Sequence, residues 1–299
     1  MSKLKIDIVK NRKIFYIISV AVLLAGVISV MIQGFNLGID FSGGTIIHIN
    51  MYDELDRARL DEIEGIVEGV IGEKPSVQKS EDAVNGYSVI IKTKELTTEK
   101  RTEVFEAVKE KYGLADTDQL AVDNVSATVG KDLRNNAILA VGIATLLMLI
   151  YIWIRFELIT GLVAVLMLLH DVCVMLAFYS LFGIQMNTTF IAAMLTIVGY
   201  SINATIIIFD RVRENLRVNN KDDFESIVNQ SIWQTMNRSL NTTITTLLTI
   251  TMVFVFGVTA VRNFALPIIV GIISGFYSSV LLAGPMWVTF KNLGVGKKK

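Results

Sequence analysis

The chain has 299 residues, 52% of them apolar, and its 28 basic residues balance 28 acidic ones. A mean hydropathy of +0.53 is too high for a soluble protein of one or two domains, so a membrane protein is indicated. With one Cys and two His, the chain lacks the ligands of a zinc site, and it has no Walker or Rossmann glycine motif. We therefore expect no metal ion, no cofactor and no enzyme activity.

Six apolar runs are close to the length that crosses a membrane. A helix needs about 20 residues to span about 30 Å of hydrocarbon. We expect membrane helices over residues 14–32, 137–154, 158–181, 188–209, 240–258 and 266–288. The first run is too long for the apolar part of a signal peptide, so we expect it to remain as an anchor.

Lysine and arginine predict the orientation, because they are enriched in the cytoplasmic loops of membrane proteins. If the chain crosses six times, nearly all basic residues near the span ends fall on one side, and Arg262 is the one basic residue in the short loops of the other side. Both termini are therefore expected in the cytoplasm. The residues on the cytoplasmic side are Lys3, Lys5, Lys10, Arg12, Lys13, Arg155, Arg211, Arg213, Arg217, Lys221, Lys291 and Lys297 to Lys299.

Between the first two spans lies a segment of ordinary soluble composition, residues 34–135, which holds 20 acidic and 12 basic residues. This acidic balance argues against binding nucleic acid or anionic lipid. Hydrophobic periodicity predicts strands over 45–50, near 77, over 87–92 and over 120–129, and helices over 55–71 and 98–112. The order β-α-β-β-α-β is typical of a ferredoxin-like α+β domain. His48 is its one possible base, so we expect a docking or binding module.

The predicted fold is thus an all-α six-helix membrane bundle with an inserted ferredoxin-like domain. Residues 1–33 form the cytoplasmic N-terminus and first helix, 34–135 the inserted domain, 136–290 helices two to six, and 291–299 a basic cytoplasmic tail. Residues 222–236 have an apolar face and suggest an amphipathic helix lying on the cytoplasmic surface.

Polar residues inside the spans are costly and usually mark interfaces or ion paths. In the third span, a charged Asp171 next to His170 must face the bundle, pair or take up a proton. In the fifth span, polar residues recur at helical spacing on one face, which fits either a packing face or an ion path. These residues are Arg238, Asn241, Thr242, Thr245 and Thr246.

The fourth and sixth spans carry two further patterns. Charged residues gather at the predicted cytoplasmic exit of the fourth span, and we interpret them as interfacial ion pairs: Asp210, Arg211, Arg213 and Glu214. In the sixth span, small residues at four-residue intervals predict a close helix contact: Gly271, Gly275 and Ser279.

Several motifs together resemble the SecD/SecF family of bacterial protein export. The sequence GIDFSGGT after the first span is similar to the family's signature and contains Gly38, Asp40, Phe41, Gly43 and Gly44. The His-Asp pair at 170–171, the sequence VGYSIN at 198–203 followed by FDRVREN at 209–215, and RSLNT at 238–242 resemble its third-, fourth- and fifth-span motifs. The match covers essentially the whole chain in order and spacing.

This resemblance implies half of a twelve-span bundle of the resistance-nodulation-division superfamily. It implies a bacterial cytoplasmic-membrane subunit that pairs with SecD, works beside the SecYEG channel after SecA, and draws unfolded polypeptide outward with an ion gradient. Membrane lipid is the other expected neighbour, and no nucleic acid is expected.

The family's intramembrane relay has an Asp directly after the Asn of its fourth-span motif, near the Arg of the fifth span, whereas this chain has Ala204. The residues that the resemblance assigns to the relay are Arg238, Asn203, Ala204, Asp171, His170, Asn241 and Thr242. Because Ala204 has no titratable group, this chain is expected to be defective in coupling, unless Asp171 or a carboxylate of SecD replaces the missing Asp.

Three alternatives remain open at the sequence level. One is a structural subunit that stabilises SecD without conducting ions, which Ala204 favours. Another is a small-molecule or lipid exporter of the same superfamily, although such exporters are expected to have twelve spans in one chain. An intramembrane hydrolase is disfavoured because no paired Asp or Ser-His motif suits that chemistry.

Overall fold

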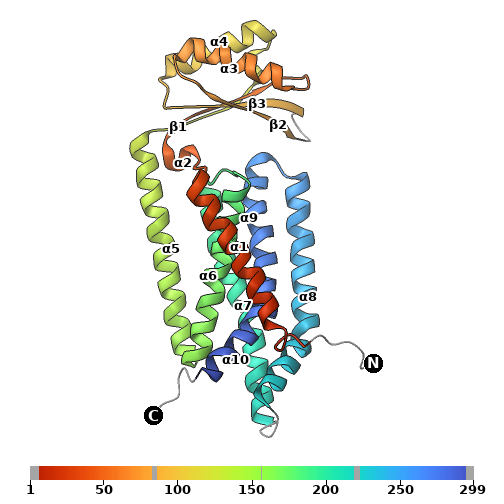
Figure 1. Ribbon diagram of the computed structural model, residues 1–299. Helices are drawn as coiled ribbons and strands as arrows, with labels where there is room; N and C mark the ends of the chain where they lie inside the picture. Colours follow the sequence, from red (N-terminus) through yellow and green to blue (C-terminus); the bar gives the residue numbers. More distant parts are fainter. Residues whose placement is uncertain (1–6, 83–85, 156, 219–222, 294–299) are drawn as a thin grey trace. The chain divides into compact units, whose positions relative to one another are not determined.

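A computed structural model describes residues 7–82, 86–155, 157–218 and 223–293 (Figure 1). The chain divides into two compact units. One contains the membrane helices, and the other spans residues 37–138 together with 258–260.

In the described part of the chain, six helical stretches are long and apolar enough to cross a membrane. Five are the single helices α1 (Arg12–Gln33), α5 (Ala127–Arg155), α6 (Leu158–Leu181), α7 (Thr188–Val218) and α8 (Phe224–Phe256). The sixth is continuous through α9 (Thr259–Tyr277), a π-helical turn η2 (Ser278–Ala283) and α10 (Gly284–Asn292). The number and order of the predicted spans are confirmed, and α6 has the predicted bounds.

The helices α6 and α7 lie at the centre of the membrane unit, with α1 against α6 and α8 against α7 (Figure 1). Buried side chains of α6, α7, η2 and α10 form one apolar core, and α6, α7 and α9 form a second. In contrast, α5 is exposed along most of its length. From Ile138 to Ile154 its exposed side chains are apolar, as expected of a helix whose solvent is hydrocarbon.

The predicted surface helix over 222–236 is wrong. Residue 222 lies outside the described residues, and from Phe224 onward α8 continues without a break into the fifth span. No Gly or Pro interrupts residues 236–240, so nothing ends the helix there. Its apolar face is buried inside the protein, since Val228 and Ile232 pack against the backbone at Gly284.

The other unit contains a four-stranded antiparallel sheet. Its elements follow the predicted order: a one-turn helix α2 (Ile39–Ser42), β1 (Gly44–Asn50), α3 (Arg57–Ile71), β2 (Ser76–Asp82), β3 (Gly86–Thr93), α4 (Thr98–Tyr112), a short 3-10 turn η1 (Asp116–Asp118) and β4 (Gln119–Val125). The strand order is β2-β3-β1-β4, and every neighbouring pair is antiparallel. Helices α3 and α4 cover one face of the sheet (Figure 1).

The last strand ends earlier than the predicted residue 129, because α5 begins at Ala127. Two side chains satisfy backbone N–H groups at this helix start: the carboxylate of Glu95 accepts from Ala127 N at 3.4 Å, and Ser126 Oγ accepts from Val129 N at 3.3 Å. These caps stabilise the start of a helix at Ala127 rather than a continuation of the strand.

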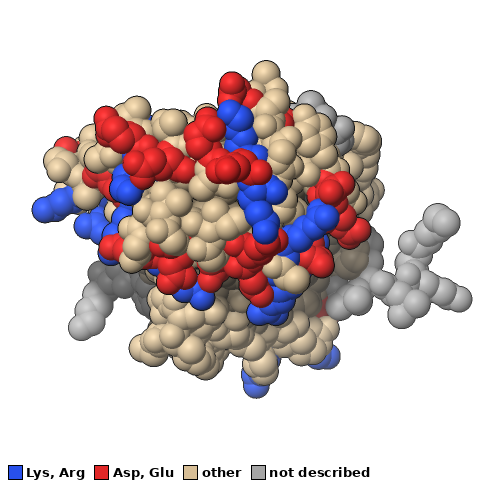
Figure 2. Space-filling view, turned by 90° about the horizontal axis from the view of Figure 1, so that it is seen from above, with Lys and Arg blue, Asp and Glu red and all other residues tan. Residues whose placement is uncertain are grey.

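Charged side chains cover the outer face of α3 and α4, where Asp and Glu are interspersed with Lys and Arg (Figure 2). Several are paired across or along these helices, such as Lys111 with Glu62 at 2.7 Å and Lys109 with Asp116 at 2.6 Å. Exposed pairs of this kind contribute little to stability. The face is therefore a solvated surface of mixed charge.

Candidate functional site

Asp171 is a buried carboxylate among the membrane helices. It lies near the middle of α6, and 1% of its surface is exposed. Of the Asp and Glu residues on the described membrane helices, no other is buried. An ionised carboxylate at this depth costs several kcal/mol unless donors surround it.

Three serines and a histidine supply those donors. Carboxylate Oδ1 accepts a hydrogen bond from Ser274 Oγ of α9 at 2.6 Å. Oδ2 accepts from Ser201 Oγ of α7 at 2.5 Å and from Ser278 Oγ of η2 at 2.8 Å. His170 Nδ1 lies 3.1 Å from Oδ1. Because an ionised carboxylate offers about four acceptor positions, these four groups match the capacity of the charged form.

The imidazole of His170 extends this network to α1. Its Nε2 lies 3.1 Å from Ser19 Oγ, and its ring stacks on Tyr277 with 6.2 Å between centroids. The Tyr277 hydroxyl in turn donates to the carbonyl of Phe15 at 2.8 Å. The His-Asp pair thereby links α1, α6, α7 and the sixth span through side-chain hydrogen bonds.

The π-helical turn begins at Ser278, one of the donors to Asp171. Such turns are rare and often occur at functional sites. The turn presents two consecutive buried serines to different partners: Ser278 to Asp171, and Ser279 to Thr205 Oγ1 of α7 at 2.9 Å.

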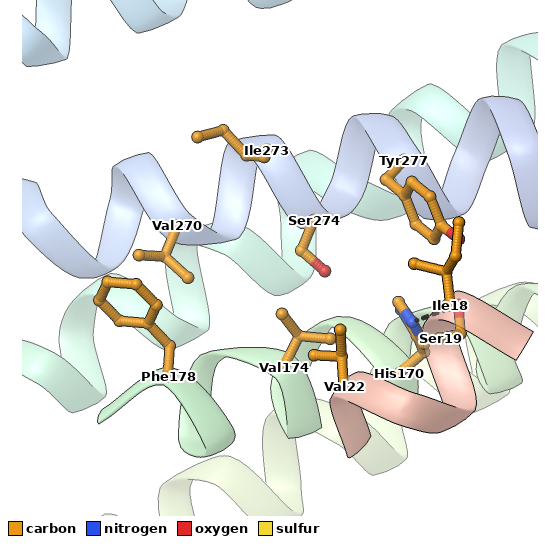
Figure 3. Close-up of a pocket in the computed structure, with 10 residues that line it drawn as sticks. All are labelled: Ile18, Ser19, Val22, His170, Val174, Phe178, Val270, Ile273, Ser274 and Tyr277. Atoms are coloured by element: carbon orange, nitrogen blue, oxygen red, sulfur yellow. Dashed lines mark hydrogen bonds between the residues drawn. The ribbon is translucent and has the colours of Figure 1, made fainter. Parts of the chain in front are cut away.

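A pocket of about 300 Å³ lies next to this network, between α1, α6 and α9 (Figure 3). His170 and Ser19 lie at one end of it, and Phe178 and Val270 at the other. Its walls are almost entirely apolar. The lining residues are Ile18, Ser19, Val22, His170, Val174, Phe178, Val270, Ile273, Ser274 and Tyr277.

The polar face of the fifth span is not brought to Asp171. In α8, Arg238, Asn241 and Thr242 are all exposed in the single chain. In α7, Asn203 is exposed and Ala204 is partly buried. Asn203 follows Ser201 by two residues, about 200° around the helix, so it points away from the side that contacts Asp171.

The charged residues after the fourth span lie together at one end of α7. Arg211 pairs with Glu214 at 2.6 Å, and Arg213 lies 3.9 Å from Asp210 and 3.7 Å from Glu157. A polar pocket of about 510 Å³ joins this group to α8; Ile207, Asp210, Arg211, Glu214, Gln234, Thr235 and Arg238 line it.

The small residues of the sixth span face α7 inside the chain. A Cβ added to Gly271 would lie 2.5 Å from the Ile197 side chain, and Ser279 bonds to Thr205. At Gly275 the nearest atom, Ser201 Cβ, is 3.4 Å from such a Cβ, an ordinary contact distance. The closest approach is therefore at Gly271.

The glycines of the GIDFSGGT signature permit close backbone contacts in the second unit. Gly43 has φ +73°, and a Cβ there would lie 2.8 Å from Ala127 Cα at the start of α5. Gly44 has φ +138°, and its Cβ would lie 2.6 Å from the carbonyl oxygen of Thr93. Both φ values favour glycine. Gly38 precedes the turn α2, which contains a partly exposed Asp40 and a buried Phe41.

Within the described residues, no three His, Cys, Asp or Glu side chains gather to hold a metal ion. The sequence pattern singles out Asp171 and His170 but not the serines that bond to Asp171, since the small residues of the sixth span predict only a close helix contact. The signal for Ser274 and Ser278 is two hydroxyl groups one helical turn apart in an apolar span, where each needs a polar partner.

Comparison with known proteins agrees with the motifs. The sequence profile described as "Protein export membrane protein SecD/SecF, C-terminal" matches residues 104–293, and the "SecD/SecF GG Motif" matches residues 28–48. The chain belongs to the SecD/SecF family.

Similar relatives include the protein translocase subunit SecF of Acidaminococcus fermentans, 40% identical over 96% of this chain and 98% of that protein. The protein translocase subunit SecDF of Bacillus subtilis is 36% identical over 96% of this chain and 38% of its own length. The crystal structure of SecDF, a translocon-associated membrane protein from Thermus thermophilus, matches with a TM-score of 0.82 and 32% identity, over 94% of this chain and 38% of that chain.

Proposed function

We propose that this chain is the SecF-type subunit of a bacterial protein-export complex in the cytoplasmic membrane, and that it pairs with SecD. Family membership supports a role in export. The relatives named SecDF extend well beyond the region similar to this chain, which covers 38% of each. A separate SecD chain would supply the remainder.

The observation that carries the pairing is the exposed polar face on α7 and α8. Asn203 and Asn241 are exposed on this face and would face hydrocarbon if this chain were alone in the bilayer, which is costly for amide groups. Arg238, which lines the polar pocket at one end of α7, continues the same face. A partner helix with polar groups would satisfy them. We therefore assign this face to SecD.

Co-purification with SecD from the same genome tests this assignment. Asn241→Trp puts bulk on the proposed contact and should reduce the recovered SecD several-fold. Leu169→Trp is the matched control, because Leu169 is 47% exposed on α6, away from this face. Equal recovery with both variants would show that SecD binds elsewhere.

Ion-gradient coupling is the finer part of the proposal. In the family pattern an Asp occupies the position of Ala204, and an intramembrane carboxylate can take up a proton on one side and release it on the other. About 2.3 kcal/mol per charge per 100 mV is available for that step. Without that carboxylate, we propose that the chain supports little proton-driven export by itself, so that any coupling depends on SecD or on Asp171.

Reconstituted vesicles that contain the SecD partner test this point. Ala204→Asp should raise export and proton flux under an imposed gradient, whereas Ala204→Asp combined with Arg238→Met should not. Full coupling with Ala204 in place would mean that the relay lies elsewhere. If neither variant changes flux while SecD still depends on this chain for stability, the chain is a structural subunit, which is the second candidate.

The inserted domain completes the proposal. Its strand order and its two helices on one face support a ferredoxin-like assignment. We place it outside the cytoplasm, where it would contact emerging unfolded polypeptide, with SecYEG and SecA supplying that polypeptide from the cytoplasmic side.

A further inference from the structure

The apolar pocket beside His170 lies in the part of the protein that hydrocarbon surrounds. With 24 residues and a rise of about 1.5 Å per residue, α6 is about 36 Å long, and His170 is at its middle. Phe178 is eight residues further along, so the pocket extends about 12 Å from mid-membrane towards the C-terminal end of α6. This is the depth range of lipid acyl chains within one leaflet.

The pocket opens towards the lipid. Ile18 of α1 and Ile273 of α9 line it and are 46% and 54% exposed. Figure 3 shows them on opposing helices, with Val22 and Val174 between the two ends of the pocket. An apolar occupant could therefore enter sideways from the bilayer between α1 and α9.

The chemistry of the walls favours a hydrocarbon chain over water or a polar ligand. The polar lining groups of Ser19, His170 and Ser274 already bond to protein partners. A water molecule needs two to four polar partners, and apolar cavities stay dry or bind apolar molecules. An alkyl chain has no hydrogen bonds to lose there and would make dispersion contacts that are otherwise missing.

A helix of the partner subunit is a poorer candidate for this pocket. The polar face assigned to SecD includes Asn203, which lies about 200° around α7 from Ser201, the residue that contacts Asp171. The pocket instead adjoins the Asp171 network from the side of α1 and α9. The face assigned to SecD is thus on α7 and α8, whereas the pocket is lined by α1, α6 and α9.

We propose that one acyl chain of a membrane lipid occupies this pocket, entering from the leaflet next to the C-terminal end of α6, with its methyl end against the Ser19–His170 hydrogen bond. The lipid chain thereby seals the His170–Asp171 pair from water on that side. The proposal rests on the pocket and its depth and holds whether or not the export function is correct.

Photocrosslinking tests the proposal with the full chain and its SecD partner. The probe is a phosphatidylglycerol with a diazirine near the methyl end of one chain, in vesicles of phosphatidylethanolamine and phosphatidylglycerol. After illumination, mass spectrometry should find label on Val22, Val174 or Ile273 at least three-fold above Ile17, a more exposed residue outside the pocket (68% exposed). Val174→Phe, which fills the pocket from α6, should reduce this label at least three-fold.

Two further variants make the result decisive. Leu169→Phe adds the same bulk on the exposed face of α6 outside the pocket and should leave the pocket label unchanged. Ile273→Phe fills the pocket from the opposite wall and should reduce the label as Val174→Phe does. If one of these two variants folds poorly, the other still tests the proposal. Three results would each overturn the proposal: uniform labelling of all exposed residues, unchanged labelling in both filled variants, or no labelling of the pocket when SecD is present.

Discussion

The side chains around Asp171 allow each donor to be tested separately. Ser278→Ala removes one of the four donors and leaves the carboxylate with an unfilled acceptor position. A hydrogen bond to a charged group contributes about 1.5–3 kcal/mol, so the complex should unfold several degrees lower. Asp171→Asn should cost more, because both carboxylate oxygens accept from serine hydroxyls and the NH2 group that replaces one of them cannot accept.

Thr102→Ala is the control for these variants. Thr102 is exposed on α4, and its hydroxyl donates within its own helix to the carbonyl of Thr98 at 3.1 Å. Thr102→Ala should change the midpoint of thermal unfolding in detergent by less than about two degrees. Equal losses in Ser278→Ala and Thr102→Ala would mean that the Asp171 network contributes nothing specific.

At the scale of helices, Gly271 and Gly275 of α9 both face α7, but substituting them should have different effects on stability. Gly271→Ala places a methyl group 2.5 Å from the Ile197 side chain and should destabilise the bundle by about 1–3 kcal/mol. Gly275→Ala meets its nearest neighbour at 3.4 Å and should be neutral or slightly stabilising, because Ala is the better helix former. Thermal unfolding of both variants checks the difference, and a larger loss at Gly275 would contradict this packing.

In the second unit, the contact between α3 and α4 should depend on pH. Lys111 and the hydroxyl of Tyr112, which donates at 2.9 Å, hold the pKa of the Glu62 carboxyl below its ordinary value of 4.5. Burial, together with this contact, raises the pKa of Tyr112 to about 12. Because the folded pKa of Glu62 is depressed, its stabilising effect is present above about pH 4.5 and is lost as the pH falls through the folded value.

Amide hydrogen exchange of α3 and α4, compared at equal pH, measures this effect. Glu62→Gln should exchange faster than the unmodified chain at pH 7, and the ratio of the two rates should fall towards one as the pH is lowered below about 4.5. Glu110→Gln, an exposed change on α4, is the control and should leave the ratio near one throughout. A Glu62→Gln ratio independent of pH would contradict the role of this carboxylate.

At the scale of the whole chain, the distribution of basic residues predicts that the inserted domain is outside the cytoplasm and the end of the sixth span inside. Glu110→Cys and Asn292→Cys, each in a Cys173→Ser background, test this because Cys173 is the one native cysteine. In cells with an opened outer barrier, an impermeant maleimide should label the Glu110→Cys variant. It should label the Asn292→Cys variant only after the cells are lysed. The reverse pattern would invert the topology.

Features that depend on neighbouring residues in the sequence can be predicted from it, whereas features that depend on contacts between distant helices cannot. The spans and the order of the sheet follow from local apolar patterns, which is why α6 and α4 have the predicted bounds. The prediction of a separate surface helix was wrong because an amphipathic pattern does not show whether its apolar face contacts lipid or a neighbouring helix. The convergence of Ser201, Ser274 and Ser278 on Asp171 depends on how three helices pack, and no local pattern encodes that.

The π-helical turn at η2 also makes the sixth span unusual in its tolerance to a change of length. A π turn accommodates one residue more than an α turn, so the helices before and after it keep the phase they would have without that residue. Deleting Leu281 should therefore restore a plain α-helix while Gly271 and Trp287 continue to face their present neighbours. Removing one residue from the middle of α6 or α7 would instead rotate half of the helix by about 100°. Among the described spans, the segment 278–283 is thus where a single codon can be lost without turning the rest of the helix.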